Sequence, residues 1–156
     1  MTNQKMPNIC LPDQNDTIVD LQSEISDFAV IFFYPKDLTS GCSKEALEFS
    51  EKLKLFEEKS CLVLGISPDK PATHQKFIDK LELKVNLLSD IEKQSCQDYQ
   101  VWKEKSMYGK KYFGVERSTF LLNKKLEIIA SWRKVKVPGH VDSVYSALID
   151  YLDKSN

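Results

Sequence analysis

The fold is decided by FAVIFFYPKDLTSGCSKEALEFSEKLKLFEEKSCLVLGIS, residues 28–67. Residues 28–33 form a continuous apolar run that ends before Tyr34-Pro35, a pattern typical of a strand buried on both faces. The apolar residues that follow, at 42, 46, 49, 53 and 56, are spaced by four and three and predict one face of an α-helix. Residues 61–66 predict a second buried strand. A strand–helix–strand unit of this kind indicates a parallel pair joined by a right-handed crossover.

The flanking segments extend this unit into an α/β order. In chain order the further predicted elements are a small extra hairpin around 8–11 and 18–21, a helix over 70–81, a short helix that Asp90 caps and that runs to about 99, a lysine-rich polar loop over 103–113, a hairpin of 118–122 and 126–132 joined at 123–125, and a helix over 140–152. This order is the thioredoxin-type arrangement. We therefore expect an α/β, thioredoxin-like fold with an N-terminal β-hairpin extension and an inserted helix.

Length and composition limit the number of domains and argue against nucleic-acid binding and membrane proteins. The chain has 156 residues, so we expect a single domain over 1–156. Lys and Arg number 22 against 23 Asp and Glu, so no strong positive field points to nucleic acid or an anionic membrane. The longest apolar run, 28–34, is far shorter than a membrane span, and the first ten residues lack the apolar segment of a signal peptide.

The cysteines indicate a reducing compartment. Cys10, Cys42, Cys61 and Cys96 lie far apart in a chain large enough to fold without disulfides, which favours a reduced, cytoplasmic protein. No close cysteine pair suggests zinc, and no phosphate-binding or dinucleotide motif occurs, so we expect neither a metal nor a cofactor.

Cys42 is the leading candidate for chemistry. It lies at the predicted start of a helix, directly after a buried strand. The free N–H groups and the positive end of the helix dipole at such a position stabilise an anion, and the thiolate is the nucleophilic form of cysteine. The alternative is that Cys42 is a small packing residue at the top of the helix stripe.

Three neighbours of Cys42 support a functional loop, and each also has a structural explanation. Thr39 precedes Cys42 by three residues, so its hydroxyl could lie beside the sulfur; alternatively it is an ordinary N-cap. Gly41 leaves the backbone free to expose N–H groups to a ligand. Pro35 could shield the pocket from water or could simply end the strand.

Pro35, Thr39 and Cys42 together form P-x-x-x-T-x-x-C, which resembles the active-site signature of the peroxiredoxins. The longer string FFYPKDLTSGCSKEALEF (32–49) is similar to the bacterioferritin comigratory, or peroxiredoxin Q, branch. The resemblance extends to MPNICLPDQ (6–14), VWKEKSMYGKKYFGVERSTFLL (101–122) and SWRKVKVPGHVDSV (131–144), and so covers nearly the whole chain.

The resemblance implies a thiol-dependent peroxidase that reduces hydrogen peroxide and organic hydroperoxides. The Cys42 thiolate would attack a peroxide oxygen and become a sulfenic acid. Thiolate formation alone is insufficient. Lowering a thiol pKa from ~8.5 to ~6 raises the thiolate fraction about 30-fold at neutral pH, but nucleophilicity falls by about 13-fold for a Brønsted slope of ~0.45. Donors that hold the peroxide and its developing charge must supply the rest.

The resemblance also assigns those donors. Arg117, one of two arginines beside twenty lysines, would lie next to the sulfur, although without the resemblance it is an ordinary arginine at a strand end. Thr39 and the Cys42 N–H would complete the peroxide cradle. Glu45, one helical turn after Cys42, would hold the arginine, or would simply be a first-turn glutamate favoured by the helix dipole.

The chain departs from the branch at the resolving cysteine. Many members carry one five residues after the reactive cysteine, where this chain has Leu47, and others carry it in the following helix, where 70–81 has none. Cys61 begins a buried strand and is expected to be inert, which leaves Cys10 and a partly exposed Cys96. We favour a one-cysteine cycle in which thioredoxin, glutaredoxin or a small thiol reduces Cys42, with Cys96 as the alternative resolving residue. A monomer is the first expectation and a dimer the second.

Two other classes remain as alternatives. A disulfide reductase would carry a second cysteine where Glu45 stands and a cis-proline where Arg117 stands. A redox sensor, whose Cys42 oxidation changes a binding surface, is compatible with the composition.

Several further residues receive no catalytic role from the sequence. His74 and His140 have no partner in the sequence. The aromatic side chains of Trp102 and Tyr108 could line the pocket but are more often packing residues. Arg133 is expected on a solvated edge.

Overall fold

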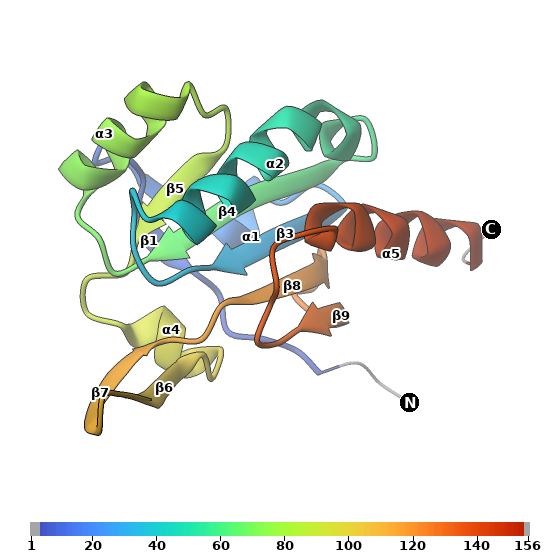
Figure 1. Cartoon of the computed structure of the whole chain (residues 1–156). Coiled ribbons are helices and arrows are strands. Elements are labelled where there is room, and N and C mark those ends of the chain that lie inside the picture. The colour runs from blue at the N-terminus through green and yellow to red at the C-terminus, as the bar shows by residue number, and fades with distance from the viewer. Residues whose placement is uncertain (1–3, 155–156) are drawn as a thin grey trace.

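A five-stranded mixed sheet forms the centre of the molecule in the computed structural model, which describes residues 4–154 (Figure 1). The strand order is β5 (Asn86–Ser89), β4 (Cys61–Ser67), β3 (Phe28–Phe33), β8 (Ser118–Asn123) and β9 (Ile128–Trp132). Strands β3, β4 and β5 are parallel, whereas β8 and β9 are antiparallel to their neighbours. This confirms the α/β, thioredoxin-like prediction; residues 1–3 and 155–156 of the expected domain lie outside the described residues.

Both faces of the sheet are covered, which explains why β3 is apolar at every position. Phe28, Val30 and Phe32 pack in a cluster with α2 (Ser40–Glu57), α3 (Pro71–Leu81) and α5 (His140–Lys154). Ala29, Ile31 and Phe33 face the opposite cluster, which includes residues of the N-terminal segment, of α1 (Leu21–Glu24) and of α4 (Gln94–Asp98). Figure 1 shows α2 and α5 lying across the same side of the sheet.

Two small hairpins flank the sheet. The predicted N-terminal hairpin is present as β1 (Cys10–Pro12) paired with β2 (Ile18–Asp20). The predicted polar loop over 103–113 is wrong: it is the antiparallel hairpin β6 (Trp102–Met107) and β7 (Lys110–Val115). Tyr108 and Gly109 turn it with φ of 52° and 78°, the positive values of a tight hairpin turn. Four of its positions are lysines. A hairpin exposed to water does not need apolar alternation, so the sequence pattern did not indicate these strands.

The short helix begins later than predicted. Lys93, with φ of 60°, occupies the N-cap position of α4, and the helix starts at Gln94. Asp90 nevertheless serves the helix from a distance, because its carboxylate accepts from the N–H groups of Ser95 and Cys96 at 3.3 and 2.8 Å. Among residues 4–154, no helix has the length and apolar character that crossing a bilayer requires.

Candidate active site

The loop between β3 and α2 delivers Cys42 to the edge of the core. The loop leaves the sheet after Tyr34, whose N–H still donates to Ile66 O at 3.0 Å. Thr39 is the N-cap of α2, so Cys42 lies in the first turn, where N–H groups have no partner within the helix. The side chain of Cys42 is only 1% exposed. A buried sulfur therefore lies at the positive end of an 18-residue helix.

Arg117 meets this sulfur from the segment between β7 and β8. Its Nη2 donates to Cys42 Sγ at 3.1 Å, and its Nη1 donates to Glu45 Oε1 at 2.7 Å. The absence of a side chain at Gly41 makes room for this approach, since a Cβ built there would lie 3.3 Å from Arg117 Nη2. Burial lowers the pKa of Arg117, but Glu45 and Cys42 outweigh burial and raise it. Four predicted site residues, Cys42, Glu45, Gly41 and Arg117 itself, thus come together at one guanidinium.

Glu45 is fully buried and only half satisfied. Burial raises its pKa to about 7, although Arg117 acts to lower it. Its Oε2 has no hydrogen-bond partner among the described residues, and the His140 Nε2 lies 4.0 Å away. Glu45 is therefore only partly ionised near neutral pH, and its Oε1 still accepts from Arg117 and can hold the guanidinium in place.

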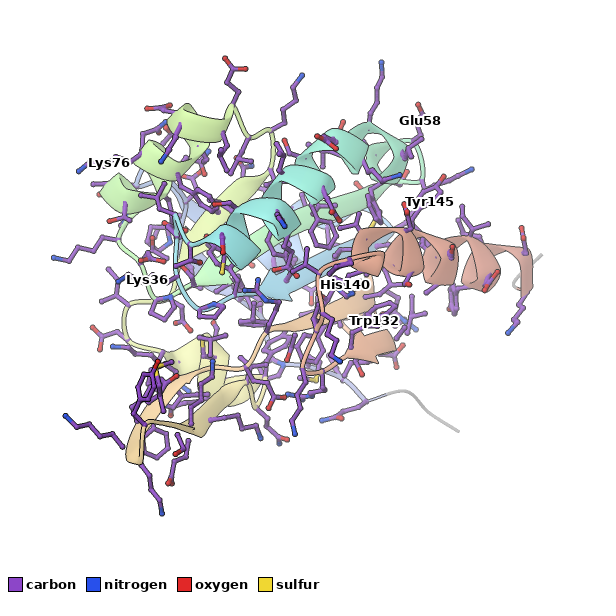
Figure 2. The ribbon with its side chains drawn as sticks, in the orientation of Figure 1. Lys36, Glu58, Lys76, Trp132, His140 and Tyr145 are labelled. Carbon is purple, nitrogen blue, oxygen red and sulfur yellow. The ribbon has the colours of Figure 1, made fainter. Side chains whose placement is uncertain are left out.

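His140 joins the site although no pattern in the sequence indicated it. It begins α5, beside Trp132 (Figure 2), and the rings of these two residues meet edge to face at 5.8 Å. Its Nε2 lies 2.8 Å from Thr119 Oγ1. Burial, followed by the charge of Arg117, lowers its pKa to about 4, so the ring is neutral near pH 7. No sequence signal identified it, because Glu45 and His140 are separated by most of the chain.

Lys105 is a second residue that the sequence did not single out. It lies half-buried on β6, and its Nζ donates to Val115 O at 2.6 Å, two residues before Arg117. Burial and then the charge of Arg117 lower its pKa, whereas Cys42 raises it. Lys105 therefore adds a second positive charge near the sulfur.

Thr39 and Pro35 are placed near the site without touching the sulfur by a hydrogen bond. The Thr39 hydroxyl is exposed and donates to Lys36 O at 2.9 Å, and it makes no capping bond to α2. Pro35 is half-buried at the start of the loop. The roles of Thr39 as a peroxide donor and of Pro35 as a shield stay predictions.

The other cysteines are all free. Cys10 is exposed on β1, whereas Cys61 is buried in β4, where burial raises its pKa to about 12. The expectation that Cys96 is partly exposed is wrong: its side chain is 0% exposed, and burial followed by the charge of Asp90 raises its pKa. Its helix α4 packs its inner side fully into the core.

Three aromatic and basic residues considered in the sequence remain: Tyr108, Trp102 and Arg133. Tyr108 is 98% exposed at the hairpin tip and therefore does not line a pocket, while the Trp102 ring stacks on Phe113. Arg133 is exposed as expected, and it also donates to the carbonyl oxygens of Tyr99 and Gln100.

One group of side chains has metal-like spacing. Asp37, Asp69 and His74 each place a ligand-type atom within 4.8 Å of the others. Asp37 lies in the β3–α2 loop, Asp69 lies in the loop between β4 and α3, and His74 lies in the first turn of α3.

The fold and the site together define a thiol-based redox enzyme built on the thioredoxin fold. Residues 2–131 match the model of the AhpC/TSA family. The peroxiredoxin Bcp of Bacillus subtilis is 40% identical over 151 residues, which cover 97% of this chain and 96% of that protein. The peroxiredoxin Bcp of Escherichia coli is 34% identical over 145 residues, or 93% of each chain.

Solved structures agree. The bacterioferritin comigratory protein of Xanthomonas campestris, studied for its alkyl peroxide reduction activity, superposes with a TM-score of 0.90 at 37% identity over 97% of this chain and 99% of that one. The chain belongs to the AhpC/TSA family and, within it, to the Bcp or peroxiredoxin Q branch of the peroxiredoxins. It is a thiol-dependent peroxidase.

Proposed function

We propose that Cys42 is the peroxidatic residue and that Arg117 is the donor that activates both its sulfur and the bound peroxide. The observation that carries the proposal is the guanidinium bridge, 3.1 Å to Cys42 Sγ on one arm and 2.7 Å to Glu45 on the other. A guanidinium presents several N–H groups in one plane, so it can contact the thiolate and the peroxide together while Glu45 fixes its orientation.

The proposed oxidation is a two-electron transfer from sulfur to oxygen. The Cys42 thiolate attacks the outer oxygen of a hydroperoxide, the S–O bond forms, and the O–O bond breaks. The product is a Cys42 sulfenic acid, and the departing oxygen takes a proton and leaves as water or an alcohol. Arg117, Thr39 and the Cys42 N–H would stabilise the charge that develops on the departing oxygen. The alkyl peroxide reduction activity of the Xanthomonas relative supports organic hydroperoxides as substrates, and the same chemistry would apply to hydrogen peroxide.

We propose that an external thiol completes the cycle. One thiol attacks the sulfenic sulfur and releases water, and a second displaces Cys42 as a free thiol while the two reductant sulfurs form a disulfide. The complete burial of Cys96 supports this one-cysteine cycle over internal resolution by Cys96. Cys10 is exposed and is the remaining internal alternative.

The proposal keeps the remaining expectations. The chain acts as a single domain over 1–156. A monomer is the first expectation for its oligomeric state, and thioredoxin, glutaredoxin or a small thiol is the proposed reductant. Its free, largely buried cysteines support a cytoplasmic setting.

The direct test compares peroxide consumption by the wild-type protein and by Cys42→Ser with excess reductant. Wild-type turnover and an inactive variant are expected; equal rates would refute the assignment of Cys42. Oxidation with one equivalent of peroxide, followed by disulfide mapping by mass spectrometry, tests the cycle. A disulfide from Cys42 to Cys10 or Cys96 would replace the one-cysteine cycle with an internal one.

A further inference from the structure

A buried charged cluster lies behind the loop that carries Cys42. Tyr34 OH donates to Asp37 Oδ1 at 2.5 Å, and His74 Nδ1 lies 2.6 Å from Asp37 Oδ2. On its other side, His74 Nε2 lies 3.0 Å from the carbonyl oxygen of Leu88. The Tyr34, Asp37 and His74 side chains are at most 3% exposed. The peroxidase mechanism uses none of them.

The hydrogen-bond partners identify the protonation state of the ring. A carbonyl oxygen only accepts, so His74 Nε2 must carry a proton. Asp37 Oδ2 and His74 Nδ1 share a second proton, and it belongs on the ring because Asp37 Oδ1 also accepts from Tyr34 OH, which favours the carboxylate over the carboxylic acid. Burial and the charge of Asp37 raise the pKa of Tyr34, so the phenol keeps its own proton and donates. His74 is therefore a buried imidazolium paired with Asp37.

This arrangement also explains the metal-like spacing of Asp37, Asp69 and His74. A histidine binds a metal through a ring nitrogen that carries no proton. Both ring nitrogens of His74 already donate to oxygens, so no lone pair is left for an ion. Hydrogen bonds, not a bound cation, hold this cluster together.

The loop beside this cluster has a conformation that needs support. Leu38, which is not glycine, has φ of 66° in the left-handed region, a strained conformation that persists only where neighbouring groups hold it. Leu38 is 43% exposed, so its own packing does not hold it. The preceding residue does: the Asp37 N–H donates to Asp69 Oδ2 at 2.8 Å, and Ser67 Oγ donates to the same oxygen at 2.6 Å.

We propose that His74 is a positioning residue for the peroxidase reaction, anchoring through Asp37 the loop that places Thr39 and Cys42. Asp37 is fixed both by its backbone N–H and by its side chain, and Thr39, the N-cap of α2, follows two residues later. The inference rests on the proposed function, since its consequence is measured at Cys42. A displacement of about 1 Å at a reacting group can reduce a rate by up to about 100-fold.

The first test reads the charge of His74 in the wild-type protein. Nitrogen-15 NMR of the histidine rings near neutral pH should show protons on both nitrogens of His74 and on one nitrogen of His140. An unprotonated nitrogen on His74 would overturn the proposal. Addition of zinc should leave the His74 signals unchanged; their loss with one equivalent of zinc would make the cluster a metal site and overturn it too.

The second test loosens the anchor. His74→Gln keeps a donor but has no charge and cannot reach Asp37 and Leu88 O together. We expect the oxidation of Cys42 by peroxide to slow by about 10- to 100-fold and iodoacetamide labelling of the buried Cys42, followed by mass spectrometry, to become faster. The matched control is Gln75→Ala, the next residue on α3, whose side chain donates to Asp79 on the same helix. Equal oxidation and labelling rates in the two variants would overturn the proposal.

A double-mutant cycle separates positioning from general destabilisation. If His74 acts through Asp37, Asp37→Asn and the double variant should lose about as much kcat/KM as His74→Gln alone. Independent, multiplying losses would overturn the proposal. The NMR and labelling readouts do not require turnover, so they remain decisive if the wild-type protein proves not to reduce peroxide, which would refute the proposed function instead.

Discussion

Replacing Arg117 with alanine tests the central contact of the site. The variant removes the 3.1 Å donor to Cys42 Sγ and leaves the buried Glu45 carboxyl without its 2.7 Å partner. A hydrogen bond to a charged group contributes about 1.5–3 kcal/mol. Since about 1.4 kcal/mol corresponds to a factor of ten in rate, oxidation of Cys42 by peroxide should slow by about 10- to 150-fold.

The assay is a single-turnover stopped-flow measurement of the second-order rate constant for oxidation by hydrogen peroxide. Arg117→Lys keeps the charge but cannot bridge Cys42 and Glu45, so we expect an intermediate rate. Arg133→Ala is the matched control, because Arg133 donates to carbonyl oxygens remote from the sulfur in sequence and should leave the rate unchanged. An Arg117→Ala rate within about threefold of wild type, under 1 kcal/mol, would refute the reasoning.

Three further predictions concern the site and the core. Glu45→Gln should remove a pH dependence: because the folded pKa of Glu45 is raised from 4.5 to about 7, wild-type stability should fall relative to the variant, by roughly 3 kcal/mol, as pH rises between these values. Urea unfolding across this range checks it, and parallel stability curves would contradict it. Thr39→Val should slow peroxide oxidation by about tenfold or more if its hydroxyl holds the peroxide; wild-type kinetics would exclude that role. Gly65→Ala should lower stability by about 1–3 kcal/mol, because its Cβ would lie 2.6 Å from Phe32 and 2.8 Å from Leu87; an unchanged thermal midpoint would contradict this.

The fold could be predicted because the local sequence patterns of residues 28–67 match the strands and the helix that form there. The unbroken apolar run of β3 is what two covered faces require, and the four-and-three spacing of α2 matches its buried stripe. The lysine-rich β6–β7 hairpin escaped prediction because its strands are largely exposed, so no alternation of apolar residues marks them.

The site could be predicted only where a local pattern or a family resemblance reached it. The position of Cys42 follows from the strand–helix junction, but the meeting of Arg117 with Cys42 spans 75 residues, and the resemblance alone anticipated it. His140 beside Glu45, and His74 beside Asp37 across 37 residues, depend on tertiary packing that sequence spacing does not record. Cys96 was misjudged because a five-residue helix is too short for its periodicity to separate an inner from an outer face.

The β6–β7 hairpin has a practical consequence for engineering. Its tip projects away from the sheet (Figure 1), and a side-chain carbon added at Gly109 would meet no described atom within 4 Å apart from its two chain neighbours. Its base is different, because β7 ends at Val115, two residues before Arg117. An epitope or fluorophore inserted at the tip should therefore be tolerated, whereas one residue added near the base would shift the strand register and carry the guanidinium off its target.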